Sequence, residues 1–344
     1  MTRTTPERPV DVKAPALVPE VSAHRRMGTR LHPRPGTPAR DQSSVGGPFL
    51  WPAGEEWPFC QEPHPRGRGE LLRDVRLRRR ILAEAWSRPS DSGTPEGPTD
   101  EEREVLKSLR RGRHAPELAD TDPIPLLAVT QLFTRDVPGL QGPGDNDLLQ
   151  VFWCPFDRHG DGQHPGLHLR WRNAAEVTGP LIEAPEPKVV GRGDYVPEPC
   201  VLHPEQVLEH EYEGLLPRDL QERIEEWEEA NEGDDEDKDG VGGPTYQHDL
   251  SIPPGWKVGG FASWHLTDPM PVDCSCGRPM DLLLTIDSKE WDGGSRSWVP
   301  VEDQPVVDEL DANIPTQISL GRWGSLRIFT CPADPTHPHR VSLQ

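Results

Sequence analysis

The sequence contains no long apolar run. Only 33% of the 344 residues are hydrophobic, and no stretch approaches the roughly 18–20 consecutive apolar residues that a membrane-spanning helix requires. The first 20 residues, MTRTTPERPVDVKAPALVPE, also lack the apolar segment of a signal peptide. These two absences predict a cytoplasmic protein with no membrane segment.

Positive charge is also scarce. The chain has 37 Lys and Arg against 58 Asp and Glu, which gives a net charge of −21. A nucleic-acid-binding protein needs a basic surface to neutralise phosphates, so we expect no nucleic-acid partner, and an acidic surface also repels anionic membranes. The negative charge serves solubility alone, or it forms a surface that recognises a basic protein.

Motifs of the common enzyme classes are absent. There is no glycine-rich loop ending in Gly-Lys-Ser/Thr, no His-Glu-x-x-His and no Gly-x-Ser-x-Gly. His159, Asp161 and His164 in HGDGQH could act as acid–base or metal groups, but their glycine spacing after a predicted strand is more typical of a polar loop. The sequence therefore favours a non-catalytic protein, although active sites are also assembled from scattered residues.

Proline and glycine, in contrast, are abundant. The 41 prolines and 32 glycines form about a fifth of the chain, above the usual share of about an eighth. This composition favours short strands joined by turns and disfavours a helical bundle. Residues 1–43 combine seven prolines with many charges and little periodicity, which predicts a disordered N-terminal arm.

Three segments carry helical signals. Residues 68–88 place apolar side chains near helical spacing, and their arginine cluster at 76–80 is a solvated face or a binding patch. The capping box that begins at Thr99 predicts a helix to about Arg111. Residues 204–231 hold two helical pieces, with one face of the second almost wholly acidic.

An acidic run follows the last of these helices. Asp235, Asp237 and Asp239 have the spacing of the first ligands of a calcium loop, but Tyr246 stands where that loop needs a glutamate. We therefore expect a solvated acidic loop here.

A repeated heptad is the most unusual feature of the sequence. VGGPFLW at 45–51 and VGGFASW at 258–264 share Gly-Gly and, four residues later, Trp. Further landmarks follow each copy in the same order: Cys60 and Cys274; PLLAVT at 125–130 and DLLLTI at 281–286; LLQVFWC at 148–154 and SLRIFTC at 325–331; CPFD and CPAD; His159 and His337. This shared order predicts an internal duplication of a β-rich unit.

The duplication defines the expected organisation. We expect an α+β fold that is β-rich and antiparallel, with a pseudo-two-fold duplication and helical insertions. The four parts are a disordered N-terminal arm (1–43), a first β-rich repeat with a helical insertion (44–180), an acidic helical connector (181–250) and a second β-rich repeat (251–344).

The same landmarks resemble a known family. The order GGPFLWP, WPFC, GDNDLLQVFWC, GWKVGGFASW, CSCGRPMDLLLTI and GSLRIFTC, from about residue 44 onward, is similar to the YwqG-like family, a bacterial domain of unknown function. The resemblance implies a compact α+β fold with antiparallel sheets and a loose link to toxin–immunity loci. It implies no reaction and no catalytic residues, and the N-terminal arm and acidic insert depart from a minimal member.

The second copy carries a candidate metal site. Cys274 and Cys276 precede one predicted strand, and Cys331 ends another, with His337 and His339 just beyond. If the two strands are neighbours, three thiolates and one imidazole converge in a Cys₃His zinc set, with His337 or His339 as fourth ligand. Buried reduced thiols are the alternative interpretation.

The first copy offers a looser set. Cys60, His64 and Cys154 match the metal positions, with His159 or His164 as the fourth, and Cys200 has no counterpart. A duplicated protein often loses one of its two sites, so we expect zinc at Cys274, Cys276, Cys331 and His337 and leave the first set open.

Two functions are compatible with these observations. The first is a non-catalytic protein-binding module with a structural zinc, such as an immunity or regulatory protein that masks a basic toxin. The alternative is a metal-dependent hydrolase whose Cys/His-bound zinc keeps an open position for water. The number of protein ligands distinguishes the two, since four close the site and three leave it open.

Overall fold

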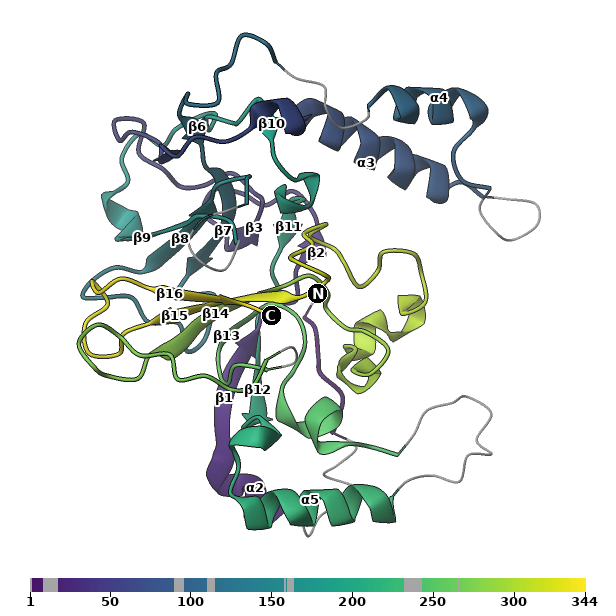
Figure 1. Ribbon diagram of the computed structural model, residues 1–344, viewed down its shortest axis with the longest axis vertical. Coiled ribbons are helices and arrows are strands. Elements are labelled where there is room, and N and C mark those ends of the chain that lie inside the picture. The colour runs from purple at the N-terminus through teal and green to yellow at the C-terminus, as the bar shows by residue number, and fades with distance from the viewer. Residues whose placement is uncertain are drawn as a thin grey trace.

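Two six-stranded antiparallel sheets form the centre of the computed structural model (Figure 1). The structure describes residues 2–8, 18–89, 96–109, 115–157, 159, 164–231, 243–264 and 267–344. The expected acidic loop around residues 235–239, and Asp161, lie outside these ranges.

The first sheet has the strand order β2-β11-β3-β7-β8-β9. Its strands are β2 (Arg34–Pro35), β11 (Cys200–Val201), β3 (Ser44–Val45), β7 (Leu127–Phe133), β8 (Leu148–Trp153) and β9 (Leu167–Arg172).

The second sheet has the order β12-β1-β13-β14-β15-β16. Its strands are β12 (Glu205–His210), β1 (Arg25–Arg30), β13 (Lys257–Gly259), β14 (Asp281–Asp287), β15 (Ser325–Thr330) and β16 (Arg340–Leu343).

Short pairs and helices complete the fold. Strand β5 (Glu70–Leu71) pairs with β10 (Val189–Val190), and β4 (Phe59–Cys60) pairs with β6 (Ile124–Pro125). The α-helices in the described ranges are α2 (Val18–Val21), α3 (Leu72–Trp86), α4 (Asp100–Ser108) and α5 (Arg218–Ala230). One-turn and irregular helices are Ser22–His24, Arg66–Arg68, Ala174–Glu176, Gly193–Tyr195, Glu213–Leu215, Tyr246–Ser251, Arg296–Trp298 and Val301–Val306.

The two sheets match strand by strand, as the duplication predicts. In each, the strand that begins the repeated heptad pairs with a long hairpin, β7–β8 or β14–β15, and a last strand follows. Each hairpin also has its bulge at the same place, just after Ala128↔Phe152 and just after Leu282↔Phe329. In this register Leu127 corresponds to Asp281, so the sequence match of PLLAVT with DLLLTI is offset by two residues.

The halves of the chain exchange one strand each. Strand β1, from the first half, pairs with β13 of the second, and β11, from the second half, pairs with β3 of the first. The flanking strands follow this exchange, because β2 pairs with β11 and β12 pairs with β1. Each sheet is therefore completed by a strand from the other half.

The exchange corrects two expected boundaries. The N-terminal arm (1–43) is not disordered over β1, which lies inside the second sheet: all of β1 pairs with β12, and its residues 28–30 also pair with β13. The connector (181–250) contains helix α5 as expected, but it also supplies β11 and β12. Sequence patterning missed these strands because β1, RRMGTR, has almost no apolar alternation.

Side-chain alternation along the hairpins produces separate clusters on their two faces. Val151 and Ile328 point into one large core that both sheets share, whereas Phe152 and Phe329, the next residues, point to the opposite faces. Successive side chains on a strand alternate in direction. Cys154 and Cys331, two residues beyond the phenylalanines, therefore lie in the smaller outer clusters rather than in the shared core.

The Gly-Gly-Trp heptads serve close packing. Gly46 and Gly259 both have positive φ (61° and 68°). Gly46 directly follows β3, and Gly259 is the last residue of β13. Trp51 and Trp264 are both buried, and an arginine guanidinium lies 4.4 Å from each ring, from Arg172 and Arg327 respectively. The heptad is thus a packing motif in both copies.

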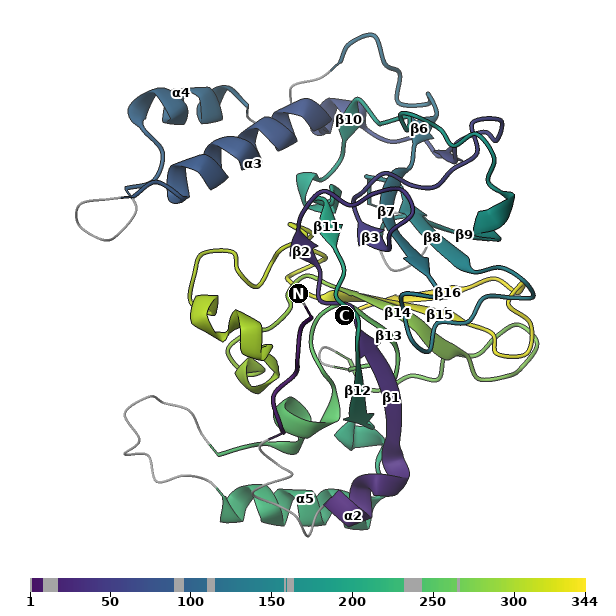
Figure 2. The same cartoon turned by 180° about the vertical axis from the view of Figure 1, so that it is seen from behind.

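The helices lie at the two ends of the molecule. Helices α3 and α4 project from one end of the long axis, and α5 crosses the opposite end (Figures 1 and 2). The capping box of α4 is present, with Thr99 and Glu102 exchanging hydrogen bonds, but the helix ends at Ser108, three residues before the expected Arg111. No helix in the described ranges has both the length and the apolar character of a membrane span.

The N-terminal residues 2–8 lie against the second half of the chain. The Arg3 guanidinium is 3.0 Å from Asp303, and the Thr5 amide donates to Glu205 at 2.8 Å. Arg8 is 8% exposed, donates to backbone carbonyls of Asp249 and Ser297, and lies 3.5 Å over the Trp298 ring. This segment is docked, contrary to the expected disordered arm.

The docked segment leads to a first prediction. We expect Arg8→Ala to lower the free energy of unfolding by about 1–3 kcal/mol, because it removes two hydrogen bonds to backbone carbonyls, one to the Ser297 hydroxyl and a cation–π contact. Glu7→Ala, at the exposed neighbour, is the control and should have almost no effect. Equal melting temperatures for the two variants in thermal denaturation would show that the segment does not contribute to stability.

The second glycine of the second heptad leads to another prediction. A Cβ on Gly260, which has φ 69°, would lie 1.6 Å from Glu209 Oε1, a buried carboxylate that is paired with Lys257. Gly260→Ala should therefore cost more than about 2 kcal/mol of unfolding free energy. Gly293→Ala, where a Cβ meets nothing within 4 Å, should be close to wild type in urea unfolding. Similar midpoints would contradict the close approach.

Candidate metal centres

The structure brings the four predicted residues of the second copy together. Cys274, Cys276, Cys331 and His337 offer ligand atoms that all lie within 4.8 Å of one another. The Cys276 and Cys331 sulfurs are 3.7 Å apart, and Cys274 Sγ is 3.3 Å from His337 Nδ1. Such a group could hold a metal ion, and the histidine that lies with the three thiols is His337 rather than His339.

Local turns position these four donors. Cys274 and Cys276 lie in a tight turn, closed by a hydrogen bond from the Cys274 amide to the Arg278 carbonyl at 2.9 Å and permitted by Gly277 at φ 81°. Cys331 follows β15 directly, so its position is fixed by the sheet. A second turn, in which the His337 amide donates to the Asp334 carbonyl at 3.1 Å, returns the imidazole to the thiols.

The imidazole of His337 has a different neighbour on each nitrogen. Nδ1 faces Cys274, whereas Nε2 is 3.6 Å from the Asp334 carboxylate. Asp334 is itself held by hydrogen bonds from the Thr336 amide and hydroxyl. A carboxylate behind a histidine fixes the orientation of the ring and increases its basicity as a ligand.

The electrostatics of this group lower the pKa values of Cys274 and Cys331, whereas the neighbouring Cys274 raises the pKa of Cys276. The backbone amide of Cys276, followed by the neighbouring thiols, lowers the pKa of Cys274 to about 6. The nearby Cys331, followed by Cys274, raises the pKa of His337. Thiolates are the metal-binding form of cysteine, so the lowered pKa of Cys274 prepares this group for a cation.

The first copy contains a matching group. Cys60, His64, Cys154 and His159 are all buried, and their ligand atoms also lie within 4.8 Å of one another. His64 Nε2 is 3.5 Å from both sulfurs. The structure selects His159 over His164 as the fourth donor. This second Cys/His group could also hold a metal ion.

The contact between the two thiols of the first group shifts their pKa values in opposite directions. A hydrogen bond from Cys154, followed by contacts with His159 and His64, lowers the pKa of Cys60. The Cys60 thiolate and burial in turn raise the pKa of Cys154. Cys200, in contrast, is buried with a pKa raised to about 12 by desolvation, and its thiol donates to the Pro315 carbonyl at 3.4 Å. It belongs to neither group.

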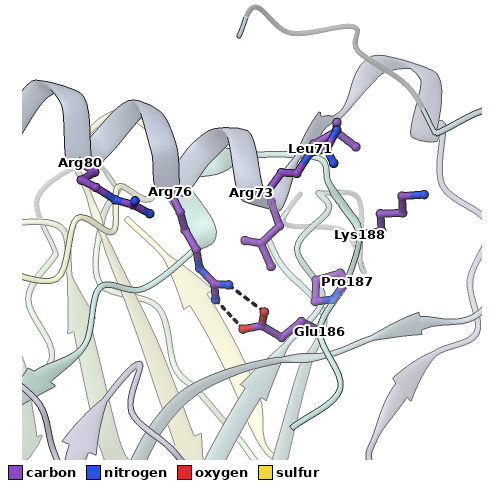
Figure 3. Close-up of a pocket in the computed structure, with 8 residues that line it drawn as sticks. Leu71, Arg73, Arg76, Arg80, Glu186, Pro187 and Lys188 are labelled. Atoms are coloured by element: carbon purple, nitrogen blue, oxygen red, sulfur yellow. Dashed lines mark hydrogen bonds and ion pairs between the residues drawn. The ribbon is translucent and has the colours of Figure 1, made fainter. Parts of the chain in front are cut away.

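A hollow lined by basic residues lies beside α3. It has a volume of about 370 Å³, and Figure 3 shows Arg76 turned toward Glu186, whose two carboxylate oxygens accept its hydrogen bonds. Lys188, on the same wall, pairs with Glu117. Within the arginine cluster at 76–80, Arg76, Arg78 and Arg79 pair with Glu186, Glu70 and Glu198 respectively, so most of this cluster is a paired helix surface.

Comparison with known proteins adds no further assignment. None of the models of known protein families matches the chain, and no curated protein is similar to it. The two Cys/His groups therefore stand on their own geometry. Sequence patterns named the cysteines and His64 of the two groups and left the last histidine of each group open between two candidates. They did not identify the carboxylates Glu62 and Asp334 near His159 and His337, although Asp334 belongs to the repeated Cys-Pro-x-Asp.

Proposed function

We propose that the protein is a non-catalytic protein-binding module, with an immunity or regulatory role, whose second repeat is held by a structural zinc. The observation that carries the structural role is the convergence of four protein donors, Cys274, Cys276, Cys331 and His337. Four protein ligands close a tetrahedral zinc site, whereas a hydrolytic zinc keeps one position for water. The resemblance to YwqG-like proteins is compatible with this proposal.

The zinc would act as a cross-link in the second sheet. Cys274 and Cys276 precede β14, and Cys331 and His337 follow β15, so one ion would join both sides of the hairpin end. The apolar cluster around it is small, consisting chiefly of Met280, Leu282 and Phe329. Metal binding contributes directly to folding when the unfolded chain does not form the site.

A basic partner is the best match for the surface charge. Helix α5 buries Leu220 and Ile224 and presents a row of exposed carboxylates on its other side. We define this acidic ridge by its exposed members Asp219, Glu222, Glu225, Glu226 and Glu229. With a net charge of −21, such a ridge would attract and orient a basic protein.

The structural zinc predicts a coupled loss of metal and stability. Cys331→Ser should release zinc from the second repeat and lower the unfolding free energy by several kcal/mol. Cys200→Ser, at a buried thiol outside both groups, is the control, and it should leave the zinc content of the protein unchanged. Elemental analysis and chemical denaturation measure the two effects. A Cys331→Ser protein with full zinc content would contradict the assignment.

The acidic ridge predicts charge-dependent binding. Reversing Glu225, Glu226 and Glu229 to lysine should abolish recovery of basic proteins in a native pull-down. A control with the same charge change, Glu101→Lys, Glu176→Lys and Glu309→Lys, alters exposed sites elsewhere and should retain the partner. If both triple variants lose the same proteins, general charge rather than α5 controls binding, and if both keep them, the acidic ridge is not the binding surface. Recurrent recovery of no partner by wild type would contradict the proposal.

A further inference from the structure

We infer that Cys60, His64, Cys154 and His159 form a second, closed metal centre, of the Cys₂His₂ zinc type, which fastens the base of the helical insertion to the end of β8. The insertion is the segment 61–123, which carries α3 and α4. This centre is independent of the proposed function, which requires metal only in the second repeat.

The geometry of the sulfur and nitrogen donors suits a tetrahedral cation. In zinc sites, Zn–S distances of about 2.3 Å and Zn–N distances of about 2.0–2.1 Å place neighbouring ligand atoms roughly 3.5–4 Å apart. His64 Nε2 already lies 3.5 Å from both Cys60 Sγ and Cys154 Sγ. The four residues are 9% exposed or less, so protein atoms rather than water enclose the centre.

The orientation of His159 is an independent indication of a ligand. Its Nδ1 lies 3.2 Å from the Glu62 carboxylate, and its buried Nε2 has no hydrogen-bond partner among the described residues. A buried nitrogen without a partner is costly, and metal coordination would satisfy it. The Glu62 carboxylate would hold the proton on Nδ1 and leave the lone pair of Nε2 free for the cation, as in carboxylate–histidine–zinc arrangements.

The position of the centre shows what it would fasten. At the base of the insertion, the His64 amide donates to the Asp120 carbonyl at 2.9 Å, and Cys60 pairs with Ile124. The entering and leaving chains are therefore already paired with each other. A metal bound by Cys60 and His64 on the entering chain and by Cys154 and His159 after β8 would join this base to the first sheet.

The internal symmetry explains why both groups occupy equivalent places. Cys154 and Cys331 each end the second strand of the matching hairpin. In the second copy, the turn from Cys274 to Arg278 occupies the position at which the insertion begins in the first copy. His64 is therefore the counterpart of Cys276. The first centre is thus enclosed by the insertion, whereas the exposed Cys276 leaves the second one closer to solvent.

Zinc stoichiometry tests the inference. Wild type should carry two zinc ions per chain, and Cys276→Ser/His337→Gln, which changes the two least buried donors of the second group, should carry one. Adding His159→Gln should remove the remaining ion, whereas adding His164→Gln, the matched control, should not. One zinc in wild type and none in the double variant, or one zinc retained after His159→Gln, would overturn the inference.

A variant that leaves all four candidate ligands in place tests the first centre with less risk of misfolding. Glu62→Gln, at a residue that binds no metal itself, should lower the zinc affinity of the first centre about ten- to hundredfold in chelator competition, and Glu56→Gln should leave this affinity unchanged.

Hydrogen exchange tests whether the centre fastens the insertion to the sheet, since His159→Gln should speed exchange around Cys60 and Ile124 but not in β15. Unchanged affinity with Glu62→Gln, or unchanged exchange with His159→Gln, would each contradict the corresponding part.

Discussion

The exchange of β1 and β11 between the halves of the chain is the constraint on which the structure depends. Each sheet needs a strand from the other half to satisfy the backbone groups of β3 or β13. The hydrogen bond from Leu31 N to Trp256 O at 2.8 Å continues the β1–β13 pairing beyond the ends of both strands. Neither repeat can therefore form its full sheet alone, and the two hairpins are held in fixed, equivalent positions.

The equivalent hairpins place candidate metal ligands at equivalent positions. Because side chains alternate along β8 and β15, the residues that directly follow these strands face away from the shared core. Those residues are Cys154 and Cys331, and in each copy a turn or insertion supplies further donors opposite them. In a chain with only 33% hydrophobic residues, metal cross-links at these two ends would add stability that the small outer clusters do not supply.

The sequence was sufficient to predict α3, α4 and α5 and to name the Cys and His residues that converge, but not the exchange. The first of the two helical pieces expected in residues 204–231 was wrong, because Glu205–His210 is strand β12. Cys274, Cys276 and Cys331 stand at the ends of strands with clear alternation, so their convergence followed from antiparallel pairing, and the capping box at Thr99 located α4. Strand β1 was missed because its pairing, not its side-chain pattern, makes it a strand. The choice of His337 over His339 depends on the turn at Asp334, which spacing alone does not determine.

Register was the other limit of sequence reasoning. Matching the apolar residues of the two copies aligned Pro125 with Asp281. The hydrogen-bond register of the two hairpins instead aligns Leu127 with Asp281. A shift of two residues preserves which face each side chain occupies, so apolar patterning could not detect it. The bulges, which do distinguish the two alignments, leave no sequence signal in these strands.

X-ray absorption at the zinc edge of the purified wild-type protein tests the central claim, paired closed centres, most directly. One Cys₃His and one Cys₂His₂ centre predict four-coordinate zinc with an average of about 2.5 sulfurs at 2.3 Å and about 1.5 nitrogens at 2.0–2.1 Å. An average of three sulfurs would indicate that the second repeat alone binds zinc. A spectrum dominated by oxygen or nitrogen, or with five or six ligands, would contradict the account.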